Sequence, residues 1–106
     1  YALNGLKDII ANETSFRLEM IIVLCLLPVI FLVSLELSYK LLMFITLLGM
    51  PLFAALHSAI ERVTDLVTLE YHEMAGRAKD AGSAVVFLSI VLFVVVWGAC
   101  LMKAFL

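Results

Sequence analysis

The chain has 106 residues, of which 65% are hydrophobic and only 15% are charged, and its mean hydropathy is +1.17. A soluble domain carries about 25% charged and about 45–50% apolar residues, so this composition excludes an ordinary water-soluble globule and predicts a single membrane domain over residues 1–106. The formal net charge of −2 says little about partners, because the distribution of charge matters more than its sum.

Residues 1–19 are mixed in polarity and predict an amphipathic helix that lies in the membrane interface. Leu3, Leu6 and Ile9 recur at helical spacing, and the polar side chains fall elsewhere on the helical wheel. A helix of this kind places its apolar face in the acyl chains and its polar face in water. The Asn12–Glu13 pair predicts a break before the chain enters the membrane.

Three apolar stretches, residues 20–35, 41–60 and 84–106, predict transmembrane helices. About 20 apolar residues are needed to cross the hydrocarbon core, and a helix is the form in which one segment satisfies its own backbone there. The second and third stretches reach that length, and apolar flanking residues extend the first. A tight turn at residues 36–40 makes an antiparallel hairpin of the first two spans, and the predicted fold class is an all-α membrane protein.

The segment 61–83 is the longest polar stretch, and we expect it to continue the second span into water before a turn near Gly76 or Gly82. Basic residues are unevenly shared between the two sides of the predicted spans. The positive-inside rule therefore places the N-terminus and segment 61–83 in the cytoplasm. The basic residues on that side are Lys7, Arg17, Arg62, Arg77 and Lys79, against Lys40 and Lys103 on the other.

Ionisable residues at the predicted membrane edge are candidates for a functional site. His57 lies four residues before Glu61 on one helix face, and Glu13 should lie at a similar depth. Charged groups at the edge of a bilayer are costly unless they are used or paired. Two carboxylates from different helices suit Mg²⁺, which keeps its other positions for water and phosphate, and Lys79 could neutralise a phosphate chain.

Two other interpretations stay open on the residues alone. The charges can belong to a solvated helix with ordinary i,i+4 pairs such as Glu73–Arg77, and neither the GxxxxGK[ST] nor the GxGxxG phosphate-binding pattern occurs. A small channel or transporter would carry polar residues at mid-membrane depth, whereas these spans are nearly all Leu, Ile, Val and Phe.

Three motifs carry a resemblance to a known family. Residues 70–84 read Glu-Tyr-His-Glu-Met-Ala-Gly-Arg-Ala-Lys-Asp-Ala-Gly-Ser-Ala, residues 58–61 read Ser-Ala-Ile-Glu, and residues 12–19 contain Asn-Glu, Phe-Arg and a final Glu. Together they resemble the signature of prokaryotic diacylglycerol kinases, collinearly over nearly the whole chain. Relatives that phosphorylate undecaprenol share the Ala-Ile-Glu and Ala-Lys-Asp cores but usually lack Glu-Tyr-His-Glu, so undecaprenol kinase is the alternative.

The resemblance implies a homotrimer of three-span subunits in the bacterial inner membrane, with composite sites at subunit boundaries. It implies transfer of the γ-phosphate of MgATP to the hydroxyl of diacylglycerol, giving phosphatidic acid. Glu13 and Glu61 would hold the metal. The implied contacts of ATP are Tyr1, Glu13, Glu61, Glu70, Tyr71, His72, Lys79 and Asp80, and those of the lipid head group are Arg17, Glu19 and Ser83.

One departure from the family pattern bears on activity. Ala54 stands where the resemblance places the glutamate that acts as general base, and His57 stands in place of an asparagine. Alanine accepts no proton, and general base catalysis typically contributes about 10²–10⁴-fold. We therefore expect impaired turnover, with His57 as a candidate substitute base. The alternative is a non-catalytic or engineered membrane protein on the same scaffold.

Overall fold

The computed structural model describes residues 1–67 and 72–106 and contains four helices in that part of the chain. They are α1 (Ala2–Asn12), α2 (Thr14–Leu32), α3 (Leu37–Val67) and α4 (Glu73–Phe105). The last three are long and apolar enough to cross a membrane. The predicted fold class, an all-α membrane protein with three long apolar helices and a short N-terminal helix, is confirmed.

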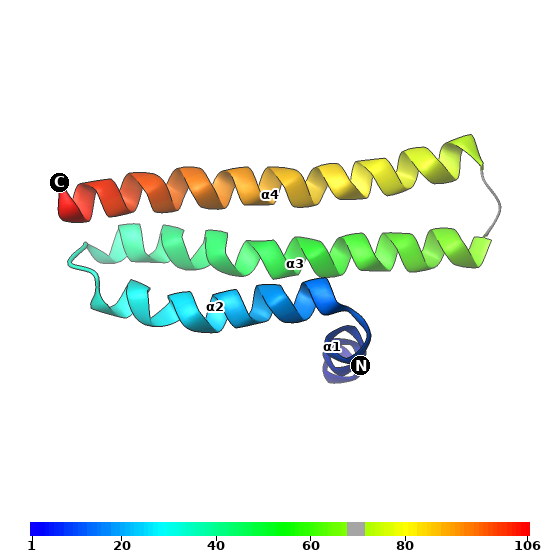
Figure 1. The fold of residues 1–106 in the computed structure, drawn as a ribbon, viewed down its shortest axis with the longest axis horizontal. Helices are drawn as coiled ribbons and strands as arrows, with labels where there is room; N and C mark the ends of the chain where they lie inside the picture. The colour runs from blue at the N-terminus through cyan, green and yellow to red at the C-terminus, as the bar shows by residue number, and fades with distance from the viewer. Residues whose placement is uncertain (68–71) are drawn as a thin grey trace.

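The three long helices lie side by side, with α3 between α2 and α4 (Figure 1). The turn from α2 to α3 and the C-terminus are at one end of the bundle. At the other end lie the C-terminal part of α3 and the N-terminal part of α4, and α1 lies across the start of α2 on that side. The bundle therefore has two distinct ends, and the residues predicted for the site belong to the one beside α1.

Extended backbone at two positions separates the first three helices. Glu13 has φ −126° and ψ 111°, which ends α1 and lets α2 begin at Thr14 in a new direction. Val33 has φ −72° and ψ 142° and ends α2. The turn precedes the predicted one at residues 36–40, because α3 already begins at Leu37.

The expected turn near Gly76 or Gly82 is wrong, because both glycines lie inside α4. The helix begins at Glu73, and His72 is its N-cap. The His72 backbone is extended, and its ring Nδ1 accepts a hydrogen bond from the Met74 backbone N–H at 3.2 Å. A glycine within a helix costs little when it allows another helix to approach closely. Gly82 is buried against α3 and has that role.

The lengths of α3 and α4 explain how a polar end coexists with apolar spans. Helices of 31 and 33 residues are about 47 and about 50 Å long at 1.5 Å per residue, whereas the hydrocarbon core is about 30 Å thick. Roughly a third of each helix must therefore extend beyond the lipid. The charged residues from Glu61 onward and those from Glu73 to Asp80 occupy these extensions.

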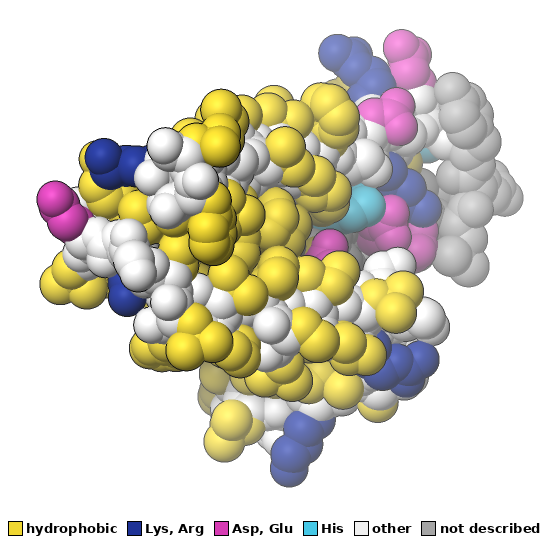
Figure 2. Space-filling view, turned by 60° about the vertical axis from the view of Figure 1, so that its left-hand side comes forward, with side chains coloured by type: hydrophobic (Ala, Val, Ile, Leu, Met, Phe, Trp, Pro, Cys, Tyr) yellow, Lys and Arg dark blue, Asp and Glu magenta, His cyan; other side chains and the backbone are white. Residues whose placement is uncertain are grey.

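The core lies in the half of the bundle away from the polar end. Met43 and Leu47 on α3 are completely buried. The indole of Trp97 on α4 is also buried, donates its Nε1–H to the Met43 carbonyl at 3.0 Å and stacks on Phe93 with ring centroids 5.1 Å apart. Large apolar side chains elsewhere on the long helices are exposed and cover much of the surface in Figure 2, as expected for a chain surrounded by lipid.

We predict that Leu47→Ala lowers the free energy of unfolding by about 2–5 kcal/mol, because it leaves a cavity among fully packed neighbours. SDS titration of the protein in micelles, followed by circular dichroism, measures the effect. The matched control is Leu32→Ala at the exposed end of α2, with an expected change of about 0.5 kcal/mol or less. Equal losses in the two variants would contradict the placement of the core.

Candidate active site

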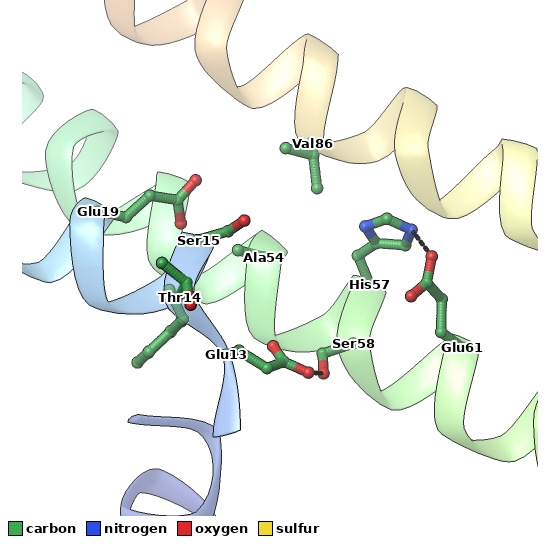
Figure 3. Close-up of a pocket in the computed structure, with 10 residues that line it drawn as sticks. Glu13, Thr14, Ser15, Glu19, Ala54, His57, Ser58, Glu61 and Val86 are labelled. Carbon is green, nitrogen blue, oxygen red and sulfur yellow. Dashed lines mark hydrogen bonds and ion pairs between the residues drawn. The ribbon is translucent and has the colours of Figure 1, made fainter. Parts of the chain in front are cut away.

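An open cavity of about 540 Å³ lies where the start of α2 faces α3, on the polar side of the bundle (Figure 3). Acidic side chains from two helices and an imidazole border it, and Val86 of α4 closes one side. Its lining residues are Glu13, Thr14, Ser15, Phe16, Glu19, Ala54, His57, Ser58, Glu61 and Val86. The cavity thus unites five of the residues predicted for the site from the sequence: Glu13, Glu19, Ala54, His57 and Glu61.

Helical spacing explains why these side chains converge. Ala54, His57 or Ser58, and Glu61 recur at three- and four-residue intervals along α3, so they share one face of that helix. On α2, Phe16 and Val23 lie three residues before and four residues after Glu19, and both are buried. Glu19 therefore belongs to the face of α2 that packs on α3.

Glu13 is held against α3 by two groups. Ser58 Oγ donates a hydrogen bond to Glu13 Oε1, and Arg62 Nη2 lies 3.5 Å from the same oxygen. Arg62 also forms an ion pair with Asp8 on α1. These contacts fix the break between α1 and α2 beside the polar part of α3.

The His57 imidazole is held between α3 and α4. Its Nε2 atom lies 3.0 Å from Glu61 Oε1 and 3.4 Å from Ser83 Oγ. Gly82 allows the ring to approach α4, because a Cβ atom at that position would lie 2.6 Å from His57 Cδ2. The ring is therefore oriented toward Glu61 and Ser83.

Glu19 differs from the other acidic residues of the cavity. Its Oε2 atom is inaccessible to solvent and has no hydrogen-bond partner among residues 1–67 and 72–106. Most buried polar atoms in proteins are hydrogen-bonded, so an unpaired carboxylate oxygen is an exception at this position. In Figure 3 its carboxylate and the His57 ring lie on opposite sides of Ala54.

Lys79 and Asp65 extend the charged surface beyond the cavity. Lys79 Nζ lies 2.7 Å from Asp65 Oδ1, and Asp65 is one helical turn beyond Glu61. Asp80 is exposed beside Lys79. Figure 2 shows a histidine among acidic and basic side chains at this end of the molecule, while a few charged side chains also mark the opposite end. The ammonium and carboxylates thus form a polar surface that continues outward from the cavity.

Other residues implied by the resemblance lie apart from the cavity in the single chain. Arg17 donates from Nη1 to the carbonyls of Ile10 and Ala11, at 3.3 and 3.2 Å, and so caps the end of α1. Tyr1 is fully exposed at the N-terminus, and His72 lines a separate cavity between α3 and α4. Glu70 and Tyr71 lie outside the described residues.

The donor set fits a magnesium ion that shares its coordination with phosphate. No group of three or more Cys, His, Asp or Glu side chains among the described residues is arranged to enclose a metal. Two carboxylates, those of Glu13 and Glu61, border the cavity. Magnesium is usually bound by one or two carboxylates together with water and substrate phosphates, so a two-carboxylate cavity is sufficient.

Sequence reasoning left several contact residues without a site role. Ser58 contacts Glu13, Arg62 joins α1 to α3, and Gly82 accommodates His57. For Ser58, the Ser-Ala-Ile-Glu motif and the three-residue spacing to Glu61 could have indicated a role in the site. The partners of Arg62 and Gly82 are far away in the sequence, and only the packing of the helices identifies them.

The comparisons with known proteins give one consistent result. A family model described as "Prokaryotic diacylglycerol kinase" matches residues 1–101. The chain belongs to the prokaryotic diacylglycerol kinase family. Similar proteins named "Diacylglycerol kinase" come from Haemophilus influenzae, with 40% identity over 95% of this chain and 86% of the relative, and from Escherichia coli K12, with 35% identity over 92% and 80%. One from Pseudomonas aeruginosa is 33% identical over 96% and 83%.

Membership in this family makes the chain a member of a kinase family, which implies the use of ATP. The arrangement of the chain agrees with such chemistry. Charged side chains at one end of the bundle provide a polar surface, and three long apolar helices carry that surface at the edge of a membrane. The cavity between α2 and α3 connects the two regions.

We predict opposite effects from two Gly→Ala substitutions in α4. In Gly82→Ala the new Cβ atom would overlap His57, and the free energy of unfolding should fall by about 1–3 kcal/mol. Gly98→Ala meets nothing within 4 Å and should raise it by up to about 1 kcal/mol through helix propensity. SDS titration measures both variants. The same response at both positions would contradict the close packing of His57 on Gly82.

Proposed function

We propose that the protein transfers the γ-phosphate of MgATP to the hydroxyl of diacylglycerol, giving phosphatidic acid at the bacterial inner membrane. One observation carries the proposal: a single cavity collects Glu13, Glu19 and Glu61 where the polar end of the bundle meets its apolar spans. A hydrophilic nucleotide and a lipid hydroxyl must meet at such a boundary. Phosphoryl transfer depends mainly on positioning and charge neutralisation, which these groups can supply.

Glu13 and Glu61 would hold the magnesium ion. When bound, Mg²⁺ would neutralise the negative charge of the ATP phosphates during transfer. The carboxylates of Glu13 and Glu61 now contact Ser58, Arg62 and His57. All of these contacts are reversible polar interactions, so the carboxylates remain available to a metal that arrives with ATP.

The nucleotide would extend outward from the cavity along α3 and α4. Lys79 and Asp80 would lie beside the phosphates, and Lys79 can exchange its ion pair with Asp65 for a phosphate oxygen. Tyr1 and His72 do not line the cavity of the single chain. A contribution of these two residues to the same ATP site would come from a neighbouring subunit, as in the composite sites of a homotrimer.

The lipid would approach from the membrane side of the cavity. Glu19 and Ala54 border it toward the apolar spans, and Ser83 and Arg17 lie on adjoining parts of α4 and α2. In this arrangement α1 lies on the cytoplasmic surface of the membrane, with the exposed Leu3 in contact with lipid. The polar end, where five basic residues gather, would then face the cytoplasm.

The Ala54 methyl group cannot accept the proton of the lipid hydroxyl, so turnover should be slow. We predict that Ala54→Glu raises the rate of phosphorylation at least tenfold, since a positioned base typically contributes about 10²–10⁴-fold. The measurement is ATP-dependent phosphorylation of a short-chain diacylglycerol by the purified protein in detergent or lipidic phase, beside the parent chain.

The substrate and a control variant make this experiment decisive. Ala55→Glu introduces the same charge at the neighbouring position of α3. Its side chain would point in a different direction from that of residue 54, so it should not raise the rate. Undecaprenol, offered as an alternative acceptor, tests the second kinase activity. No increase with Ala54→Glu would contradict the explanation of slow turnover, and no phosphorylation of either lipid by either protein would favour a structural role for the scaffold.

Metal binding gives a prediction that does not depend on turnover. Glu13→Gln and Glu61→Gln should each weaken binding of Mn²⁺, used as a paramagnetic substitute for Mg²⁺, by roughly tenfold or more, because each removes a charged ligand. Electron paramagnetic resonance titration in the presence of a non-hydrolysable ATP analogue measures this affinity. Glu36→Gln, in the turn at the opposite end of the bundle, should bind as the parent does. Unchanged affinity in both cavity variants would exclude these carboxylates as ligands.

A further inference from the structure

We propose that Glu19 is the catalytic base of this chain, the group that takes the proton from the lipid hydroxyl where position 54 offers only a methyl group. The inference rests on the proposed lipid kinase function and assigns a catalytic residue to it. Three features carry the assignment: the direction of the Glu19 side chain, the absence of a competing partner for its carboxylate among the described residues, and its location beside Ala54.

The direction of Glu19 follows from the packing of α2. Phe16 and Val23 flank it on the same helix face and are 3% and 2% exposed. Glu19 is therefore a carboxylate on the inward face of a helix whose neighbouring inward residues are apolar. An ionisable side chain in that position is costly, and such residues in membrane proteins generally belong to functional sites.

The carboxylate has an oxygen that no described donor occupies. Glu19 Oε2 is buried and accepts no hydrogen bond from the described residues. By contrast, Glu13 Oε1 accepts from Ser58 and lies near Arg62, and Glu61 Oε1 lies 3.0 Å from His57. Among the three acidic residues that line the cavity, Glu19 is the one whose carboxylate shows a buried oxygen with no donor.

Depth in the membrane also favours Glu19. Glu13 is level with Ser58, because the two side chains are in contact. Six residues from Glu13 to Glu19 move about 9 Å along α2, and four residues from Ser58 to Ala54 move about 6 Å along α3 in the same spatial direction. Glu19 and Ala54 therefore both border the lipid side of the cavity, on the far side of the carboxylates proposed to bind the metal.

His57 is less suited to the same task. Its Nε2 atom contacts Glu61 at 3.0 Å and Ser83 at 3.4 Å, and the ring packs against Gly82. The imidazole is thus positioned as a partner of Glu61, on the opposite side of Ala54 from Glu19 (Figure 3). Moving it into the cavity would break both polar contacts, whereas Glu19 Oε2 has no hydrogen bond to a described residue that would have to break.

The reaction step balances without an additional reactant. The lipid hydroxyl oxygen forms a bond to the γ-phosphorus of ATP, the bond from that phosphorus to the β,γ-bridging oxygen breaks, and ADP leaves with the bond's electrons. The hydroxyl proton moves to the Glu19 carboxylate, which becomes a neutral carboxylic acid. It then releases the proton to water as the products depart.

A double-mutant cycle tests the assignment. Glu19→Gln keeps the size of the side chain and removes its basicity, and it is made in the parent and in the Ala54→Glu background. In the parent we expect kcat to fall at least about 100-fold, with KM for MgATP changed less than about threefold. In the Ala54→Glu background the introduced carboxylate accepts the proton, so Glu19→Gln should change kcat less than about threefold.

Two further variants complete the experiment. Glu36→Gln, the same chemical change at the opposite end of the bundle, should leave kcat within about twofold of the parent. His57→Gln should have a smaller effect: its kcat should stay at least about tenfold above that of Glu19→Gln. The assignment is overturned if Glu19→Gln turns over like the parent, if its loss is equally large in both backgrounds, or if His57→Gln has the larger effect.

The same measurements separate this inference from the proposed function. If the parent is silent and Ala54→Glu alone is active, the protein is a lipid kinase in which Glu19 is not a base, and only the inference fails. If neither protein phosphorylates diacylglycerol, the proposed function fails as well. Turnover in the parent that disappears in Glu19→Gln and returns in the double variant supports both.

Discussion

Glu13 stands at the break between α1 and α2, and two groups on α3 contact its Oε1 atom: the Ser58 hydroxyl and the Arg62 guanidinium. Because Arg62 also pairs with Asp8, the surface helix, the first span and the central span are joined at one point. The cavity exists because α2 enters the bundle at this place. Without that junction, Glu13 and Glu19 would not be held beside α3, and the cavity that they line with Glu61 could not form.

The bundle concentrates its polar chemistry at one end and its tight packing in the other half. Around Met43, Leu47 and Trp97 the side chains fill the space between the helices. Toward the polar end, small residues such as Ala54, Ser58 and Gly82 replace large ones, and the helices leave a cavity rather than a core. Small residues thus allow close approach of α3 and α4 around His57 and also leave a cavity between α2 and α3.

Position 54 carries an alanine where the family resemblance implies a carboxylate, yet the other charged groups around the cavity are present. The two proposed metal ligands, the Lys79–Asp65 pair and the buried Glu19 all remain in place. Phosphoryl transfer is dominated by positioning and electrostatics, so a chain can keep most of its catalytic arrangement after losing one proton acceptor. Glu19 borders the same cavity as Ala54 and is the proposed proton acceptor.

Periodicity and composition alone were sufficient for the helical membrane fold, because three apolar stretches of spanning length have few alternatives in lipid. The break at Glu13 was also predictable. The connection between α3 and α4 was misplaced, since Gly76 and Gly82 were interpreted as turn residues although both are helical. Glycine ends helices in water, but in a packed bundle its lack of a side chain allows a neighbouring helix to approach, and sequence does not reveal which role applies.

For the site, the sequence by itself determined which residues carry charge at the membrane edge, that Glu61 and His57 share a helix face, and that Ala54 cannot act as a base. Only the tertiary structure decided which of these groups meet. It brought Glu13 to Ser58, turned His57 toward Glu61 and Ser83, and left Glu19 Oε2 without a partner among the described residues. Periodicity fixes the face of a helix on which a residue lies, but the register and approach of a second helix come from packing between distant segments.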